Sequence, residues 1–310
     1  MKRSLPFLLL IIFVMTACVD YPYDPETAQN IPARPEPLLI DNIPPIPVIA
    51  RSELEQERTY RLEEIRFPSF SVAYWQPTGA GPHPAILLLP AIWGDRYMNR
   101  FARDLVEKGF ICVQLPSHRY LDRVRQLHEI ELSSLAETIR QQVMETEQLL
   151  GWLSTQPSVD PNRIGILGAS IGAIIASLLT ESDNRIQASA YLLGGGNLSE
   201  VMAAPQGYVK KRVRQRIMSQ NGMTDEEFQK EAALTLKAVD PLTYAGRLDP
   251  SRIFMVNGRF DEVIPYKNAK EFWNALGRPD WLVIPAGHYT ASFFLRYIRY
   301  RVSQHFIQQL

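Results

Sequence analysis

The stretch Arg163-Ile-Gly-Ile-Leu-Gly-Ala-Ser-Ile-Gly-Ala-Ile-Ile-Ala-Ser-Leu-Leu179 decides the fold. Its first six residues form a short, mostly apolar run that is typical of a strand covered on both faces. The residues after Gly172 are apolar over more than one helical turn. Ser170 lies between the two segments with Gly168 and Gly172 on either side. This G-x-S-x-G spacing predicts a sharp strand-to-helix turn that exposes a serine hydroxyl above the sheet.

Five further apolar runs predict the remaining strands of the same sheet. They cover residues 85–90, 110–115, 188–193, 253–257 and 281–285. Helical patterns separate several of these runs, and strand–helix alternation predicts a doubly wound, mostly parallel α/β sheet with helices on both faces. Residues 60–67 and 70–75 partly alternate apolar and polar side chains, which predicts antiparallel strands before the parallel part.

The composition excludes several classes of protein. The chain has 310 residues, 46% of them hydrophobic, and it carries 33 Lys and Arg against 33 Asp and Glu. Zero net charge without a clustered basic stripe excludes the electrostatic surface that nucleic-acid binding needs. Two cysteines exclude a framework of several disulfides. The sequence has no H-E-x-x-H motif, no cysteine pair at ligand spacing and no phosphate-binding loop, so we expect no metal ion and no cofactor.

The N-terminus has the layout of a secretory signal. Lys2 and Arg3 precede an apolar run over residues 5–17, which is too short to cross a bilayer as a helix. The run is followed directly by Cys18, and this junction resembles the lipobox of bacterial lipoproteins. The resemblance implies that residues 1–17 are removed and that Cys18 is diacylated and becomes the N-terminus. The alternative is an ordinary cleaved signal followed by an incidental cysteine.

A proline-rich segment follows the cysteine. Eight prolines lie between residues 21 and 47, and this density keeps a chain extended and unpaired. We therefore predict a semi-rigid tether over residues 18–50; an ordered arm that wraps around the domain is the alternative. Val19 occupies the position where inner-membrane retention would favour Asp, so the lipoprotein resemblance implies the outer membrane facing the periplasm. The expected location is the bacterial cell envelope, with the membrane as a partner through the lipid anchor.

One interval breaks the alternation of strands and helices. Residues 199–247 lie between two predicted strands, and this is far more than such a connection needs. The interval is helical and charged, with a capping-box pattern from Thr224 to Glu227. We expect its basic run at 210–216 to face solvent. The interval is a candidate cap over the pocket of one domain that covers residues 51–310.

Ser170 needs a base, and that base needs an orienting carboxylate. Only two histidines follow Ser170 in the sequence. His288 comes after the last predicted strand, at the sheet edge where doubly wound sheets place their reactive groups, whereas His305 is expected to pack in the last helix or lie at the surface. Asp261 follows the preceding strand and is the candidate acid. Glu262 is the neighbour that could replace it.

Two backbone amides are the candidate oxyanion hole. The N–H of Ile171 follows the nucleophile and begins the helix, where an oxyanion is stabilised. The second donor is expected in the loop after the strand at 85–90, from Ile92 or, as the alternative, from Ala91. Trp93 in the same loop is expected to form a wall of the substrate pocket.

In this order the motifs resemble the α/β-hydrolase superfamily, and within it the branch similar to dienelactone hydrolases and prolyl oligopeptidases. The resemblance covers the chain from about residue 58 onward and implies Ser170 as nucleophile, Asp261 as acid and His288 as base. It departs where Pro90 and Ala91 replace the His-Gly of many relatives. Dienelactone hydrolases use a cysteine nucleophile, so their substrate is not implied here. The matching motifs are Ala91-Ile-Trp-Gly94, Gly168 to Gly172, Gly258-Arg-Phe-Asp261 and Ala286-Gly-His288.

These expectations combine into a membrane-tethered serine hydrolase of the carboxylesterase type. It would act on a small-molecule ester or acyl substrate through an acyl-enzyme. Ester hydrolysis is favoured over hydrolysis of small peptides because the sequence holds no propeller or other domain that gates peptides. A catalytically silent envelope protein that binds ligands on the same fold is the alternative from another class.

Overall fold

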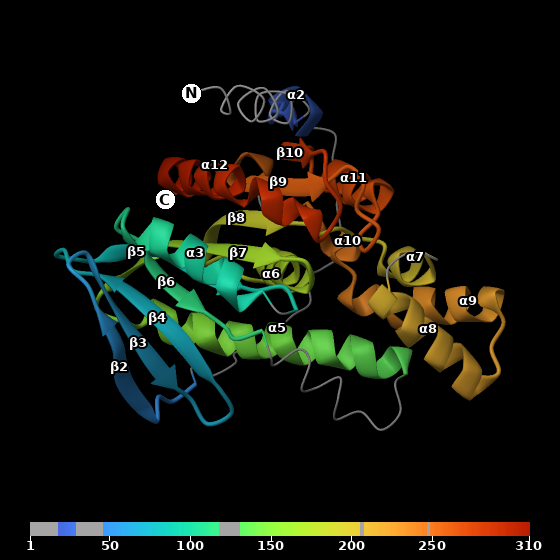
Figure 1. Ribbon diagram of the computed structural model, residues 1–310, viewed down its shortest axis with the longest axis horizontal. Helices are drawn as coiled ribbons and strands as arrows, with labels where there is room; N and C mark the ends of the chain where they lie inside the picture. Colours follow the sequence, from blue (N-terminus) through green and yellow to red (C-terminus); the bar gives the residue numbers. More distant parts are fainter. Residues whose placement is uncertain (1–17, 29–45, 93, 118–130, 205–207, 247–248) are drawn as a thin grey trace, which may run out of the picture.

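A ten-stranded sheet runs through the protein in the order β1-β10-β9-β8-β7-β5-β6-β4-β3-β2 (Figure 1). The computed structural model describes residues 18–28, 46–92, 94–117, 131–204, 208–246 and 249–310. The strands are β1 (Val19–Tyr21), β2 (Ala50–Gln56), β3 (Tyr60–Arg66), β4 (Ser71–Pro77), β5 (His83–Leu89), β6 (Ile111–Gln114), β7 (Val159–Ala169), β8 (Ile186–Leu192), β9 (Ile253–Gly258) and β10 (Asp280–Ile284).

The middle of the sheet is parallel. The six strands from β6 through β5, β7, β8 and β9 to β10 pair in parallel with their neighbours. β4 pairs antiparallel with β6, and β3 and β2 continue that edge in antiparallel pairing. The predicted α/β fold, a mostly parallel sheet preceded by antiparallel strands, is confirmed.

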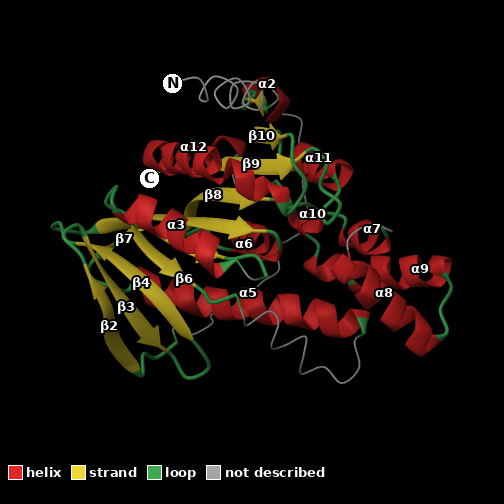
Figure 2. Cartoon of the chain, viewed as in Figure 1, coloured by secondary structure: helices red, strands yellow, loops and turns green. Residues whose placement is uncertain are grey.

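Helices cover both faces of the sheet (Figure 2). Side chains of α5, α6 and α11 belong to one apolar core, and those of α3 and α12 to the other. The strands supply both cores, because successive side chains of a strand point to opposite faces. The helices are α2 (Pro25–Ala28), α3 (Asp95–Val106), α5 (Leu132–Ser154), α6 (Ile171–Ser182), α7 (Leu198–Ala203), α8 (Tyr208–Asn221), α9 (Asp225–Thr235), α10 (Pro241–Tyr244), α11 (Tyr266–Ala275) and α12 (Leu295–Gln309), with 3₁₀ turns η1 (Lys237–Val239), η2 (Pro250–Arg252) and η3 (Thr290–Phe294).

The long interval between β8 and β9 forms helices α7 to α10. In Figure 1, α7, α8 and α9 lie together on the side toward which the arrowheads of the parallel strands point. The capping box at the start of α9 is present: the N–H of Glu227 donates to Thr224 Oγ1 (3.3 Å), and the N–H of Thr224 donates to Glu227 Oε2 (2.8 Å). The expectation that the whole basic run faces solvent is wrong for Lys210, which is buried.

The start of the predicted tether is part of the sheet. Residues Val19–Tyr21 form β1 and pair antiparallel with β10, so the expectation of an unpaired segment is wrong for these residues. The physical reason is that β10 would otherwise present a row of unpaired backbone groups at the sheet edge. The ordered arm kept open as the alternative describes this part better. The predicted signal, residues 1–17, and residues 29–45 of the predicted tether lie outside the described residues.

Side chains hold β1 in place. The ring of Tyr21 packs on Trp281 and on Trp273, with centroid distances of 5.4 and 5.6 Å. Arg301 of α12 donates to the carboxylate of Asp20 at 2.6 Å. These contacts order a strand that is only three residues long.

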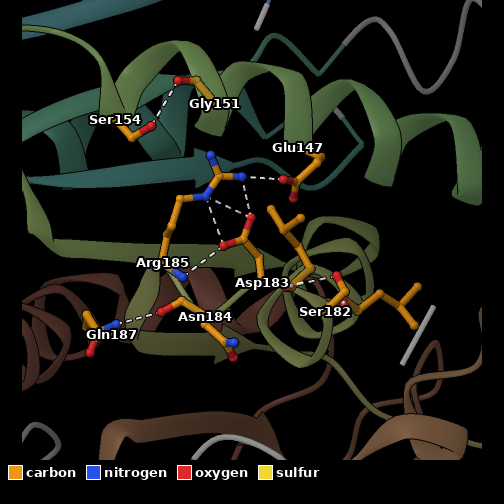
Figure 3. A network of polar contacts seen from close by, with 10 residues as sticks. Glu147, Gly151, Ser154, Ser182, Asp183, Asn184, Arg185 and Gln187 are labelled. Atoms are coloured by element: carbon orange, nitrogen blue, oxygen red, sulfur yellow. Dashed lines mark hydrogen bonds and ion pairs between the residues drawn. The ribbon is translucent and has the colours of Figure 1, made fainter. Parts of the chain in front are cut away.

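An ion cluster joins α5 to the turn between α6 and β8 (Figure 3). The guanidinium of Arg185 contacts the carboxylates of Glu147 and Asp183, and the backbone N–H of Arg185 donates to Asp183 Oδ1 at 2.8 Å. The cluster fixes the end of α6 against α5.

None of the helices in the described part of the chain combines the length and apolar character that crossing a bilayer requires.

We expect His305 to make stability depend on pH. The side chain is buried beside Phe254, and burial lowers its pKa from the ordinary 6.5 to about 4. The folded protein thus keeps the imidazole neutral while the unfolded chain binds a proton below pH 6.5. The free energy of unfolding is therefore unaffected by this group above pH 6.5. It decreases as the pH falls from 6.5 towards 4, by about 3 kcal/mol in total.

The measurement is urea unfolding of the wild type and His305→Leu at pH 7 and pH 5. The decrease in unfolding free energy between the two pH values should be smaller in the variant by about 2 kcal/mol. Equal decreases in both proteins would contradict the assignment.

Candidate active site

Ser170 lies at the turn between β7 and α6. Its backbone has φ of 55° and ψ of −119°, a conformation that side-chain-bearing residues rarely adopt. Such a conformation costs of order 1–3 kcal/mol and persists only where the surroundings enforce it. The Ser170 N–H donates to the carbonyl of Leu192 on the neighbouring strand β8 at 2.8 Å, which contributes to that enforcement. The hydroxyl is thereby held at the carboxyl end of the sheet.

The two glycines of the motif are required by close backbone contacts. A β-carbon on Gly168 would lie 2.7 Å from the α-carbon of Ala173, and one on Gly172 would lie 2.7 Å from the carbonyl oxygen of Pro90. Both positions therefore allow helix α6 to pack directly against the ends of β7 and β5. The G-x-S-x-G spacing predicted a sharp turn at this position, and these close backbone contacts are the reason that the turn needs both glycines.

Ser170, His288 and Asp261 meet at one point. The distance from Ser170 Oγ to His288 Nε2 is 2.9 Å, and that from His288 Nδ1 to Asp261 Oδ2 is 2.7 Å. An ionised carboxylate only accepts hydrogen bonds, so Nδ1 carries the proton and Nε2 is left to accept from the serine hydroxyl. The arrangement can remove a proton from the serine when it attacks an electrophile.

The carboxylate of Asp261 is fixed and shielded from water. Its side chain is completely buried, while that of His288 is 10% exposed. The backbone N–H groups of Val263 and Ile264 donate to its other oxygen at 2.8 and 2.9 Å. Asp261, rather than its neighbour Glu262, thus faces the imidazole. The buried position of His305 agrees with the packing role expected for that residue.

The residues expected to supply oxyanion donors lie around the same cavity. Ile171, Ile92 and the alternative Ala91 all line it together with Ser170. Ile171 is the first residue of α6, where backbone N–H groups point away from the helix. Trp93 lies outside the described residues, so its expected place in the pocket wall stays a prediction.

The cavity has a volume of about 470 Å³. Its walls are mostly aliphatic and come from α3, α5, α6, η3 and α12 and from the interval between β8 and β9. Among the residues that the structure describes, no group of three or more His, Cys, Asp and Glu side chains could hold a metal ion.

Lys210 lines the cavity, although its basic run was expected to face solvent. Its Nζ donates to the carbonyl of Val263, two residues after Asp261, at 3.1 Å. Burial lowers the pKa of its ammonium, and the nearby carboxylates of Asp261 and Glu262 oppose this shift. A run of basic residues in a helix is spread over all of its faces, so only the packing of α8 could show which residue turns inward.

Comparison with known proteins identifies the family. The model of the dienelactone hydrolase family matches residues 70–240, more than half of the chain, including Ser170. None of the curated proteins matches the sequence.

Solved structures show the same fold at low sequence identity. An acetyl xylan esterase from a Paenibacillus species is 13% identical with a TM-score of 0.66, and the alignment covers 91% of this chain and 99% of that chain. Acetyl xylan esterase 1 from Thermoanaerobacterium sp. JW/SL YS485 is 16% identical with a TM-score of 0.58 and coverages of 89% and 99%. An esterase of Pyrococcus furiosus is 15% identical with a TM-score of 0.52 and coverages of 89% and 99%. The family match and the shared fold together establish that the chain belongs to the dienelactone hydrolase family and is an α/β-hydrolase.

Proposed function

We propose that this protein is a serine hydrolase that cleaves carboxylic esters of small molecules through an acyl-enzyme. The observation that carries the proposal is the continuous hydrogen-bond chain from Ser170 through His288 to Asp261. The esterase names of several structural neighbours agree with it. We further propose that a lipid on Cys18 anchors the protein in the bacterial cell envelope, at the outer membrane facing the periplasm.

The reaction begins when His288 Nε2 takes the proton of Ser170 and the serine oxygen attacks the ester carbonyl. The backbone N–H groups of Ile171 and Ile92 stabilise the negative oxygen of the tetrahedral intermediate. The imidazolium then gives its proton to the leaving alcohol, and an acyl group remains on the serine. A water molecule, deprotonated by the same imidazole, releases the acid and restores the hydroxyl.

The role of Asp261 follows from its surroundings. The carboxylate holds the imidazole so that Nδ1 carries the proton, and it stabilises the positive imidazolium that forms during attack. The two backbone donors at Val263 and Ile264 prevent the carboxylate from turning away.

The anchor proposal involves strand β1. Cys18 directly precedes Val19–Tyr21, which are part of the sheet, and its side chain is partly exposed. A lipid on this cysteine would hold the edge of the domain close to the membrane. Several acyl chains, each contributing about 0.8 kcal/mol per buried methylene, would make the attachment effectively permanent.

Replacing the nucleophile tests the enzymatic proposal. Ser170→Ala should lower kcat/KM for p-nitrophenyl butyrate by at least about 10³-fold and abolish labelling by a fluorophosphonate, because the attacking oxygen is removed. Ser182→Ala, at the opposite end of the same helix, is the matched control. It should hydrolyse the ester and react with the fluorophosphonate as the wild type does. If wild type and Ser170→Ala release nitrophenol equally slowly and the probe leaves the wild type unlabelled, the fold is catalytically silent.

Neutralising the acid tests the orientation of the base. Asp261→Asn keeps the size of the side chain but removes its charge, so we expect a loss of about 10³- to 10⁴-fold in kcat. Glu262→Gln, the neighbouring change of the same kind, should leave kcat within a few-fold of the wild type. Steady-state kinetics of both variants decides the assignment. A large loss in Glu262→Gln with little loss in Asp261→Asn would reverse it.

Removing the lipid acceptor tests the anchor. In a bacterial host, Cys18→Ser should move the protein from the membrane pellet to the soluble periplasmic fraction and eliminate incorporation of an alkynyl fatty acid. Cys112→Ala, at the buried second cysteine, should still be labelled and should still pellet. Lipid labelling that persists in Cys18→Ser would rule out this cysteine as the attachment site.

A further inference from the structure

The cavity at Ser170 has apolar walls on two opposite sides. Ser170 lies at the carboxyl end of β7, near the middle of the sheet, and the cavity is formed by residues from the helical layers on both faces. Because the sheet separates the two layers, their side chains line the cavity from opposite sides.

The first wall comes from the layer of α5 and from the helices between β8 and β9. Its aliphatic side chains are Leu135, Ile139, Leu198, Val201, Val213 and Leu236. All of them except Val201 belong to the apolar core of that face or pack on it. Three of these six residues, Val201, Val213 and Leu236, come from the interval 199–247 that was predicted as a cap.

The second wall comes from the layer on the other face. It is formed by Met98, Phe101, Ala291, Leu295 and Ile298 of α3, η3 and α12. These residues belong to or pack on the other core, which also supplies Leu192 and Val256 at the strand ends. An ester bound at Ser170 would therefore place its two substituents against different apolar walls.

Most of the polar side chains along the cavity, apart from Ser170, His288 and the exposed hydroxyl-bearing rings of Tyr97 and Tyr289, donate hydrogen bonds within the protein. Four of them donate to neighbouring protein atoms: Thr138 Oγ1 to the Ser134 carbonyl (2.8 Å), Gln142 Nε2 to Glu145 (3.3 Å), Lys210 Nζ to the Val263 carbonyl (3.1 Å) and Ser292 Oγ to the Tyr289 carbonyl (2.9 Å). A sugar alcohol enclosed by these walls would lose its hydrogen bonds to water without adequate replacement, and this is costly.

We propose that the site selects esters that are apolar on both sides of the scissile bond. This inference rests on the proposed ester hydrolysis and names its substrate class. The cavity volume of about 470 Å³ lies within the range of pockets that take small-molecule ligands. An ester of an aliphatic acyl chain of about eight carbons with a hydrophobic alcohol of about six is a ligand of this kind.

Chain-length profiles test the acyl side. Each methylene that leaves water for an apolar wall raises kcat/KM by up to about fourfold. The protein should therefore hydrolyse p-nitrophenyl octanoate about 10²-fold more efficiently than the acetate, and the palmitate less efficiently than the octanoate because it exceeds the cavity. A preference for acetate in a protein whose Ser170 reacts with a fluorophosphonate would overturn this inference while the proposed function stands.

A second pair of substrates tests the alcohol side. Hexyl octanoate should be hydrolysed at least about tenfold more efficiently than a glucose monoester of octanoate, because the sugar finds few hydrogen-bond partners. Equal efficiency, or a preference for the sugar ester, would contradict the two-sided apolar site.

Filling one wall at a time separates the two sides. Val213→Trp fills space in the cavity beside α8, and Leu295→Trp fills space beside α12. Leu234→Trp, at an exposed position of α9, is the matched control. One of the first two variants should reduce the preference for octanoate over acetate, and the other the preference for hexyl over methyl alcohol. Leu234→Trp should change neither preference. If both variants alter the same side of the substrate, the assignment of two walls is wrong.

Binding and labelling keep these results independent of folding and of turnover. A small fluorophosphonate should label Ser170 in all three Trp variants at a rate close to that of the wild type, which shows that the nucleophile is in place. Calorimetry with the ketone in which a methylene replaces the ester oxygen of hexyl octanoate measures occupancy alone. The wild type should bind this ketone at least about tenfold more tightly than either wall variant. Failure of the wild type to bind it would overturn the inference even in an active esterase.

Discussion

The close approach of three backbone segments around Ser170 is the constraint on which the site depends. The ends of β7 and β5 and the start of α6 meet there, and no side chain fits between them at Gly168 or Gly172. The serine accepts an unfavourable φ because the hydrogen bond to Leu192 and the packing of α6 leave no relaxed alternative. The rest of the fold, including the ion cluster that fixes the far end of α6, keeps these segments in position. The stability of the whole sheet thus offsets the free-energy cost of the strained backbone at Ser170.

The same arrangement explains why residues distant in the sequence can form one site. His288 is 118 positions from Ser170 and still lies within hydrogen-bond distance, because both follow strands of the same parallel sheet. A parallel sheet places all of these strand ends at one edge, so each connection can supply one group without disturbing the others. The connection after β8 is long enough to supply a wall of the cavity as well.

Much of this could be predicted from the sequence, because buried strands and glycine-restricted turns leave local signals. The apolar runs predicted the parallel strands, and the order of Ser170, Asp261 and His288 indicated which loops to bring together. Other features depended on contacts that no local pattern contains. β1 is three residues long, too short for a period-two pattern, and is ordered by the edge of β10 and by Trp281. The burial of Lys210 is determined by how α8 packs, and the helical period alone does not select one basic residue among several.

Strand β1 also affects how the protein can be shortened. Removing the chain before residue 50 would eliminate β1 together with the proline-rich stretch and leave one side of β10 without a neighbour. The indole of Trp281 would lose the Tyr21 ring that covers it. Exposed strand edges of this kind recruit other chains, so a fragment that begins after the proline-rich stretch would tend to self-associate. Soluble versions are better begun at Val19, so that β1 is kept and still pairs with β10.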